Sequence, residues 1–278
     1  DLKNEQRFQW RMLKMLKLEH ISITFNEGTP DEKRALRNIN LELKKGEFVT
    51  VIGGNGAGKS TLMNIISGNL ISDVGNISID GNRVDYLPEF KRSQFIGRVF
   101  QDPMAGTAPS MTIEENLAIA YARNKSRKLR LGVTNKRREM FREYLKTLNL
   151  GLENRLNAKV GLLSGGERQA LSLLMATFTE PSILLLDEHT AALDPARAEL
   201  ITELTSEIVE KFNLTTLMVT HNMQQALDMG DRLIMMDAGQ IIFDVSGEEK
   251  TKLTIENLLE EFQRIRGRQL ASDQAVLG

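Results

Sequence analysis

A glycine-rich stretch of the chain has the residue types that hold a phosphate chain. It matches the pattern G-x-x-x-x-G-K-[ST] in full and reads Gly53-Gly54-Asn55-Gly56-Ala57-Gly58-Lys59-Ser60. Glycines let backbone N–H groups approach phosphate oxygens, and the N-terminus of a helix after the loop attracts the same anion. We expect Lys59 to reach the β- and γ-phosphates and the Ser60 hydroxyl to bind Mg²⁺, which prefers oxygen ligands. The stretch therefore predicts a site for a nucleoside triphosphate with Mg²⁺.

Two acidic residues, Asp187 and Glu188, directly follow the apolar run Ile183–Leu186. Ligands of open α/β sheets bind at the carboxyl ends of the strands, so Asp187 is a candidate Mg²⁺ ligand. Glu188 would then lie near a water molecule that faces the γ-phosphate, and a carboxylate there can orient or deprotonate that water. Taken alone, the pair is typical of a solvated strand end. Together with the glycine-rich loop it favours a catalytic role.

A third segment, Ser164-Gly165-Gly166-Glu167, combines a helix start with two glycines. Ser164 and Glu167 have the spacing of a capping box, which is by itself a common structural feature. A capped helix start also attracts anions through its free N–H groups and its dipole. Because the two glycines leave room for a close ligand, the segment predicts a second phosphate-binding surface, without indicating whose phosphate binds there.

Helices and strands alternate around these three segments. Strands are expected before the glycine-rich loop and before the acidic pair, and helices after the loop and from Glu167 onward. The expected ranges are Phe48–Ile52, Ser60–Gly68, Ile183–Leu186, Arg197–Phe212 and Thr215–Val219. This alternation predicts an α/β fold with a parallel sheet. Residues from about 102 to 165 have mainly helical patterns.

Composition excludes several classes of protein. The 278 residues include 36 Lys and Arg against 37 Asp and Glu, so the charge balance argues against nucleic-acid binding through the whole surface. The chain has no cysteine, which excludes disulfides, iron–sulfur clusters and a cysteine nucleophile. Its three histidines are too widely spread along the sequence to suggest a metal cluster. No run approaches the 18 or so apolar residues that a membrane span needs, so we expect a cytoplasmic chain.

The string Leu163-Ser164-Gly165-Gly166-Glu167 resembles the signature of the ABC ATPase family. Val99-Phe100-Gln101 is similar to the Q-loop of that family, and Val219-Thr220-His221 to its switch-histidine strand. The segment from Asp187 to Asp194 resembles the second nucleotide motif and the D-loop. This resemblance covers about residues 16–245. It implies a P-loop NTPase (RecA-like) core with a mainly parallel sheet, an N-terminal antiparallel β-subdomain and an inserted α-helical subdomain.

The resemblance also implies a division of the chain. Residues 16–250 would form the ABC ATPase domain, with the helical subdomain at about 102–165. Residues 251–278 would form a C-terminal helix, expected over Glu256–Arg266, and a tail. Residues 1–15 would be a leader or residues foreign to the protein, with a native N-terminal arm as the alternative.

Roles in catalysis and metal binding follow from the same motifs. The resemblance implies that Glu188 is the general base, that His221 contacts the γ-phosphate, and that Asp187 holds Mg²⁺ through water. Gln101 would contact the metal or the attacking water, and Ser60 would bind the metal.

Further residues are implied to bind ATP. Phe25 would stack on adenine, although a core phenylalanine is the alternative at that position. Ser164 and Gly166 would contact ATP bound to the opposite subunit, and Asp194 would line the interface between the subunits. The full implied set is Phe25, Gly53, Asn55, Gly56, Ala57, Gly58, Lys59, Ser60, Thr61, Ser164, Gly165, Gly166, Glu167 and Asp194.

The sequence departs from the family pattern at two positions. His189 stands where many relatives have proline, and Ala191 where many have serine. Neither replaces a group with a catalytic role. We expect the position of His189 beside Glu188 to reflect packing.

One set of motifs without a membrane span implies partners. Two copies of the chain, or the chain and a related ATPase, would pair so that each signature faces the other's phosphate loop. The resemblance points to bacterial importer ATPases of systems with tryptophan/tyrosine-type solute-binding proteins. It therefore implies an integral-membrane permease, docked on the helical region after Gln101, and a peripheral position on the inner face of the membrane. The alternative is a non-transport ABC ATPase that acts as an assembly factor or associates with nucleic acid.

A basic run extends from Arg123 to Arg142. It is interpreted as a solvated helical face, as a contact with anionic lipid headgroups, or as a contact with an acidic permease loop. Nucleic acid is the least supported partner because few aromatic residues are interleaved with the basic ones.

Overall fold

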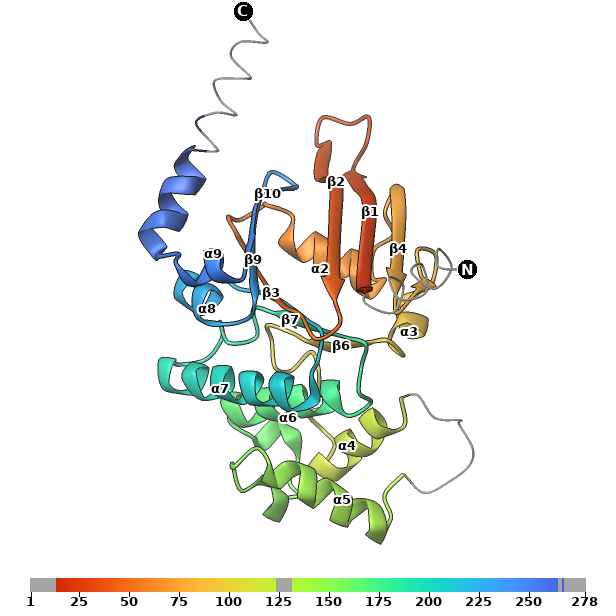
Figure 1. Cartoon of the computed structure of the whole chain (residues 1–278). Helices are drawn as coiled ribbons and strands as arrows, with labels where there is room; N and C mark the ends of the chain where they lie inside the picture. Colours follow the sequence, from red (N-terminus) through yellow and green to blue (C-terminus); the bar gives the residue numbers. More distant parts are fainter. Residues whose placement is uncertain (1–13, 124–131, 265–266, 268–278) are drawn as a thin grey trace, which may run out of the picture.

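The computed structural model describes residues 14–123, 132–264 and 267, and these form two sheets and a group of helices (Figure 1). The strands that make up the two sheets are β1 (Lys14–Phe25), β2 (Lys33–Lys44), β3 (Phe48–Gly53), β4 (Val74–Ile79), β5 (Asn82–Arg83), β6 (Ile96–Val99), β7 (Ile183–Asp187), β8 (Thr216–Val219), β9 (Arg232–Asp237) and β10 (Gln240–Ser246).

The first sheet is antiparallel and has the strand order β2-β1-β4-β5. Its central strand, β1, places Leu18 opposite both Leu41 and Ile77. All three side chains are buried in one cluster that continues to the second sheet, which explains the alternation of apolar and polar residues in these strands. The antiparallel N-terminal β-subdomain is thus confirmed. Its first strand begins two residues before the expected boundary at residue 16.

The second sheet has the order β10-β9-β3-β8-β7-β6. All of its neighbouring strands are parallel except β10, which runs antiparallel to β9 at one edge. The strand β3 lies inside the sheet, and its residues from Phe48 to Ile52 are all buried. Continuous apolar runs of this kind are typical of parallel strands covered on both faces. The mainly parallel core predicted from the alternation is confirmed.

The carboxyl ends of four parallel strands meet at one edge of this sheet. Asp187 at the end of β7 pairs with Val219 at the end of β8, which in turn pairs with Val51 in β3. On the other side of β7, Val99 at the end of β6 pairs with Leu186. The segments that follow these strands are therefore adjacent in space although they are far apart in the sequence.

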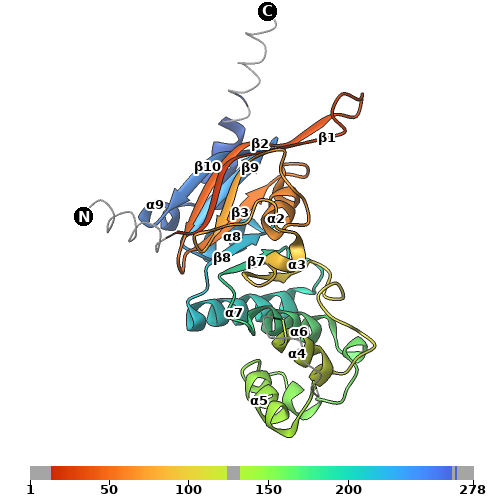
Figure 2. The same cartoon turned by 90° about the vertical axis from the view of Figure 1, so that its right-hand side faces the viewer.

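One group of helices lies below the sheets in Figure 1 and extends away from them in Figure 2. They pack through an apolar cluster that includes edge-to-face contacts of Phe141 with Tyr121 and Phe178, at 6.2 and 5.9 Å between ring centroids. In the part of the chain that the structure describes, these helices are α4 (Ile113–Tyr121), α5 (Asn135–Lys146), α6 (Gly165–Thr177) and α7 (Pro195–Phe212), with short 3₁₀ turns at Leu152–Asn154 and Val160–Leu162.

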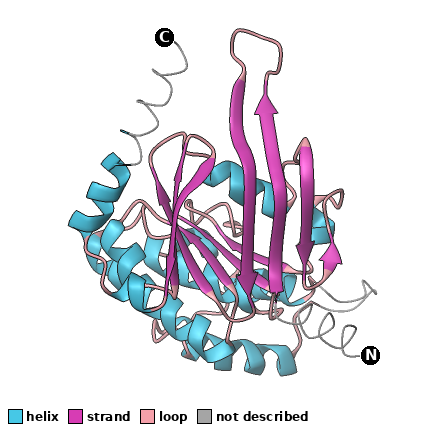
Figure 3. Cartoon of the chain, turned by 45° about the horizontal axis from the view of Figure 1, so that its top comes forward, coloured by secondary structure: helices cyan, strands magenta, loops and turns pink. Residues whose placement is uncertain are grey.

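The remaining helices lie next to the strands of the two sheets (Figure 3). They are α2 (Lys59–Ser67), α3 (Glu89–Arg92), α8 (Met223–Asp228), α9 (Glu248–Thr251) and a helix over 255–264. That last helix packs its fully buried Leu258 against Leu233 and Val245. Of the expected helix Glu256–Arg266, residues 265 and 266 lie outside the described residues. Among the helices described, none has the length and apolar character to cross a bilayer.

Candidate nucleotide site

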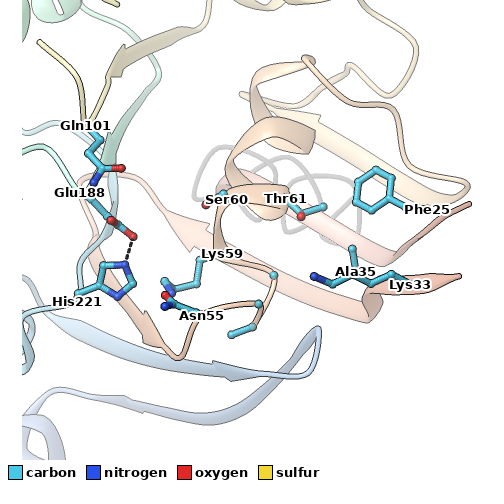
Figure 4. A pocket seen from close by; sticks show the side chains of 13 residues that line it. Phe25, Lys33, Ala35, Asn55, Lys59, Ser60, Thr61, Gln101, Glu188 and His221 are labelled. Atoms are coloured by element: carbon cyan, nitrogen blue, oxygen red, sulfur yellow. Dashed lines mark ion pairs between the residues drawn. The ribbon is translucent and has the colours of Figure 1, made fainter. Parts of the chain in front are cut away.

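One pocket brings together most of the predicted site residues. It lies at the sheet edge where the parallel strands end, and Figure 4 shows its labelled side chains converging from both sheets and from α2. Eleven predicted residues line it: Phe25, Asn55, Gly56, Ala57, Gly58, Lys59, Ser60, Thr61, Gln101, Glu188 and His221. Two further lining residues, Lys33 and Ala35, were not predicted. Their spacing is the feature of the sequence that could have identified them together, because alternate residues of β2 face the same side of the strand.

The glycine-rich loop has the backbone shape that a phosphate site needs. Gly56 and Gly58 have φ of 81° and 100°, in the region that favours glycine. A Cβ atom on Gly58 would lie only 2.7 Å from the carbonyl oxygen of Ala35, so a larger residue does not fit. Gly58 directly precedes α2, whose N-terminal N–H groups therefore open into the pocket.

The side chain of Lys59 is hydrogen-bonded to the backbone of the phosphate loop. Its ammonium group donates hydrogen bonds to the carbonyl oxygens of Gly53, at 2.8 Å, and of Gly54, at 3.0 Å. Burial lowers the pKa of Lys59, while the nearby Glu188 and Asp187 carboxylates act in the opposite direction. A buried ammonium held at the floor of an anion-binding loop can exchange these carbonyl contacts for phosphate oxygens.

Glu188 and His221 contact each other at the opposite wall of the pocket. The Nε2 atom of His221 lies 2.6 Å from Oε1 of Glu188, the ion pair drawn as a dashed line in Figure 4. The Glu188 side chain is 10% exposed, whereas that of His221 is 46% exposed. Glu188 has φ of 48°, and its N–H donates to the carbonyl oxygen of Val219 at 2.9 Å. This left-handed conformation turns the chain after β7 and directs the carboxylate into the pocket.

Asp187 ends β7 beside the pocket and is held by an arginine that sequence reasoning missed. Its Oδ2 atom accepts a hydrogen bond of 2.8 Å from Arg98 in β6. The same guanidinium donates to Asn64 Oδ1 at 2.9 Å and to Ser67 Oγ at 3.1 Å, both in α2. Arg98 therefore fixes the Asp187 carboxylate relative to the helix that follows the phosphate loop. The only signal in the sequence is an arginine within the otherwise apolar run Ile96–Val99.

The oxygen donors around the pocket fit Mg²⁺. Within the residues described, no group of three or more His, Cys, Asp or Glu side chains is arranged to hold a metal alone. Mg²⁺ is commonly bound by one or two carboxylates together with the phosphates of its substrate. The Ser60 hydroxyl, the Gln101 amide oxygen and the Asp187 carboxylate supply donors of that kind.

The capping box predicted at Ser164 is confirmed. Ser164 Oγ accepts from the Glu167 N–H at 3.3 Å, and Glu167 Oε2 accepts from the Ser164 N–H at 2.7 Å. Arg155 pairs with the other carboxylate oxygen of Glu167 at 2.8 Å. The arrangement keeps the start of α6 rigid and its first N–H groups available to an anion.

The signature segment does not line the pocket of its own chain. Gly165 and Gly166 begin α6, and a Cβ atom on each would approach Leu193 and Arg197 at 3.3 and 3.2 Å. Asp194 caps α7 by accepting from the Arg197 N–H at 3.2 Å. The signature and the D-loop thus lie against each other, away from Lys59 and the phosphate loop.

Phe25 fits both of its predicted alternatives. It lines the pocket, yet it also packs against the apolar cluster between the sheets. A ring with one side on the core and the other toward the pocket is held in place and still offers a surface to an adenine base.

His189, the departure beside Glu188, is buried in the core. Its Nε2 lies 3.0 Å from Thr205 Oγ1, and that hydroxyl donates to the carbonyl oxygen of Ile201 at 2.7 Å, so we assign the N–H to Nε2. Burial lowers the pKa of His189 from 6.5 to about 4. A neutral, fully buried imidazole supports the expected packing role.

His189 makes the stability of the fold depend on pH. Above pH 6.5 the imidazole is neutral in both states, and its contribution to stability is fully present. As the pH falls from 6.5 to about 4, only the unfolded chain binds the proton, so stability is lost across this window. The expected loss is about 3 kcal/mol of unfolding free energy.

Urea unfolding of the wild type and of His189→Gln between pH 7 and pH 4 measures this effect. Glutamine keeps a donor for Thr205 and does not titrate, so the variant should lose correspondingly less stability than the wild type over the window. Parallel curves for the two proteins would show that His189 does not carry the dependence.

Arg98 and Asp187 should be energetically coupled. Their side chains are only 11% and 16% exposed, so Arg98→Met leaves a poorly solvated carboxylate without its counter-charge. We expect a loss of about 1–3 kcal/mol in unfolding free energy, of which Asp187→Asn in the same chain restores a part. A double-mutant cycle measured by urea unfolding without nucleotide tests this.

Arg142→Met, which breaks an exposed pair with Glu139, is the control and should change stability by less than about 0.5 kcal/mol. Additive effects of the Arg98 and Asp187 changes would contradict the coupling.

Known proteins share both the sequence and the fold. A family model described as ABC transporter matches residues 36–191. The chain is 45% identical over 249 residues to a tyrosine transport ATP-binding protein of Clostridioides difficile, covering 90% of this chain and 99% of that protein. It is 34% identical over 248 residues to a glycine betaine/carnitine/choline transport ATP-binding protein of Bacillus subtilis, covering 89% of this chain and 62% of that protein.

Solved structures give the same result. A dimeric ATP-binding cassette in a post-hydrolysis state, bound to ADP and Pi, has a TM-score of 0.71 at 31% identity and covers 84% of this chain and 98% of its own. An ATP-binding cassette in its ADP conformation has a TM-score of 0.73 at 29% identity, with coverages of 90% and 98%. With its motifs in family order and most of them gathered at one pocket, the chain belongs to the ABC transporter family, as an ATP-hydrolysing ATP-binding subunit.

Proposed function

We propose that the chain is the motor subunit of a bacterial importer, in which paired ATPase subunits drive a separate integral-membrane permease supplied by an extracytoplasmic solute-binding protein. The observation that carries the proposal is the incomplete pocket. The phosphate loop, Gln101, Glu188 and His221 converge, while the signature segment at Ser164 lies outside. A second chain is therefore needed to bring a signature segment to the nucleotide. The dimeric cassette bound to ADP and Pi supports such pairing.

The substrate class follows from similarity. The relative that shares 45% identity is a tyrosine transport ATP-binding protein, and a second relative is a glycine betaine/carnitine/choline transport ATP-binding protein. We propose an aromatic amino acid such as tyrosine or tryptophan as the transported solute. The subunit would then work at the inner face of the cell membrane.

In the proposed mechanism the pocket binds both the adenine base and the phosphates of ATP. The base stacks on Phe25, and the phosphates contact the N–H groups of the loop and the Lys59 ammonium. Ser60, Gln101 and Asp187 would hold Mg²⁺, which would neutralise the charge that develops on the phosphates. The N–H groups at the start of α6 in the partner chain would contact the same ATP, so that nucleotide becomes part of the interface.

Hydrolysis requires a water molecule in line with the γ-phosphate. The Glu188 carboxylate accepts a proton from that water as the water oxygen attacks the γ-phosphorus, while the bond to the β-phosphate oxygen breaks and ADP and phosphate are formed. His221 orients the carboxylate through the contact seen here. The side chain of Gln101 enters the pocket from the segment after β6 and can report the state of the γ-phosphate to the helices beyond it. Loss of the γ-phosphate removes contacts across the interface, which allows the pair to open.

Exposed apolar side chains on both sides of β6 in the sequence are candidates for contact with the permease. Tyr86 and Phe90, beside and within α3, are 80% and 74% exposed, and Met104 after Gln101 is also exposed. Large contiguous apolar patches on a protein surface mark contacts with other proteins, and we propose that these side chains contribute to such a patch. Tyr86 and Phe90 precede β6 and Met104 follows Gln101, so these exposed side chains flank the strand that leads to Gln101. We place the docking of the permease at this part of the surface, slightly before the helical region predicted from the sequence.

The basic run offers less support for an additional partner. Arg138 pairs with Glu114 at 2.7 Å, Arg142 pairs with Glu139 at 2.6 Å, and Arg137 lies 5.5 Å from the ring centroid of Tyr121. These contacts favour a structural role for the three arginines. The members from Lys125 to Arg130 lie outside the described residues.

A pull-down of tagged Glu188→Gln protein from membranes of the source cell, with mass spectrometry, tests the proposal. Recovery of a multi-span membrane protein, with or without a solute-binding protein, is the expected result. The same protein carrying Tyr86→Ser and Phe90→Ser is the matched control and should lose the permease while keeping ATP binding. Ribosomal, DNA-bound or soluble assembly partners in place of a permease would overturn the transport assignment.

A further inference from the structure

A lysine outside every motif projects into the nucleotide pocket. Lys33 is the first residue of β2 and pairs with Phe25 of β1 in the antiparallel register. Directly paired residues of two antiparallel strands point to the same face, and Ala35, two residues further on, shares that face. All three residues line the pocket. The side chain of Lys33 thus stands beside the ring expected to stack on the base.

The Lys33 ammonium lies close to the phosphate loop. Its Nζ atom is 3.9 Å from the point where a Cβ atom on Gly56 would stand. Figure 4 shows the side chain extending from the Phe25 side of the pocket toward that loop. Lys59, by contrast, is tied to carbonyl oxygens at the other side of the same loop. The pocket therefore holds two ammonium groups, one on each side of the phosphate loop.

Arg34, the next residue in β2, does not share the position of Lys33 in the nucleotide pocket. Arg34 is on the opposite face of the strand, is 71% exposed, and lies 3.7 Å from Glu32. Lys33 makes neither a salt bridge nor a side-chain hydrogen bond with the residues that the structure describes. Its charge is available to a ligand, whereas the charge of Arg34 is turned away from the pocket.

We propose that Lys33 binds the α- and β-phosphates of the nucleotide. A nucleotide that stacks its base on Phe25 and places its terminal phosphates against Lys59 must pass its α- and β-phosphates between Phe25 and the loop, where the Lys33 ammonium lies. A lysine carries a compact charge on a flexible stem and forms charge-assisted hydrogen bonds with phosphate oxygens. The inference rests on the proposed ATP site and adds a contact to it.

This contact has a distinct consequence for nucleotide affinity. The α- and β-phosphates are common to ATP and ADP, so Lys33 should strengthen the binding of both nucleotides to the same extent. A contact with the γ-phosphate would strengthen the binding of ATP alone. The ratio of the ATP affinity to the ADP affinity therefore distinguishes a contact with the α- and β-phosphates from a contact with the γ-phosphate.

Calorimetric titration of ATP and ADP into Lys33→Met, Lys33→Arg and Arg34→Met, all in the full chain with Glu188→Gln, tests the inference. We expect Lys33→Met to weaken both nucleotides by roughly 5- to 20-fold and by equal factors. Lys33→Arg should restore most of the affinity. Arg34→Met, which removes the same charge from the adjacent position, should leave it within about twofold.

Thermal unfolding of each variant without nucleotide shows whether the fold is kept, and Lys33→Gln serves if the methionine variant is unstable. Unchanged affinity in Lys33→Met, or a loss confined to ATP, would overturn the inference while the ATP site stands. Failure of the parent protein to bind either nucleotide would overturn the proposed function itself, and the inference with it.

Discussion

Replacement of Glu188 by glutamine is expected to slow ATP turnover by roughly 10²–10⁴-fold while ATP binding is kept. The substitution removes the carboxylate that accepts a proton from the attacking water and retains the size and shape of the side chain. Because the amide can still contact His221, the walls of the pocket should stay in place. The loss should therefore appear in the turnover number, with little change in the dissociation constant for ATP.

Steady-state phosphate release and calorimetric ATP binding on the same purified preparation separate the two effects. Glu203→Gln, an exposed carboxylate on α7, is the matched control and should have wild-type turnover. Full activity in a pure preparation of the Glu188 variant would remove Glu188 from the role of general base. A parallel loss of binding would instead indicate that the substitution disturbs the pocket.

Replacement of Lys59 by alanine should abolish tight nucleotide binding. The Lys59 side chain is buried against the phosphate loop, where its ammonium group can neutralise the charge of the β- and γ-phosphates. We expect the affinity for ATP to fall by on the order of 10²-fold or more, since charge-assisted contacts with phosphate are lost and not replaced.

The same titration of Lys45→Ala provides the control, because that exposed lysine lies in the turn before β3 and away from the pocket. It should bind ATP like the wild type. Wild-type affinity of the Lys59 variant by calorimetry would contradict the assignment of the phosphate loop.

The sequence was sufficient to predict the parts of the site that are contiguous in the chain. The loop from Gly53 to Ser60, the acidic pair at the end of β7 and the capping box at Ser164 each combine a chemical function with a local structural signal. The parallel sheet was predictable because its strands are continuous apolar runs separated by helices.

The residues that were missed depend on contacts between distant segments. Arg98 is 89 residues away from Asp187, and Lys33 is over twenty residues away from Gly56. A single basic residue in a strand has no local pattern that distinguishes a contact of this kind from solvent exposure. The strand register determines both contacts, and it follows from the packing of the whole domain.

Local pattern also could not place the signature segment relative to the pocket. Ser164 and Lys59 belong to the same chain and are expected at the same ATP, yet the structure separates them. Physical chemistry predicts an anion site at the start of α6. The identity of the anion depends on a second molecule, about which helix and strand patterns carry no information.

The mass of Glu188→Gln protein in solution, measured by light scattering with and without MgATP, tests most directly whether ATP completes its site by pairing two chains. We expect a mass near 31.3 kDa without nucleotide and about twice that value with saturating MgATP. Adding Lys59→Ala to the same chain should keep the lower mass under both conditions. A mass of one chain at saturating MgATP, at the highest concentration at which the protein stays soluble, would contradict the account.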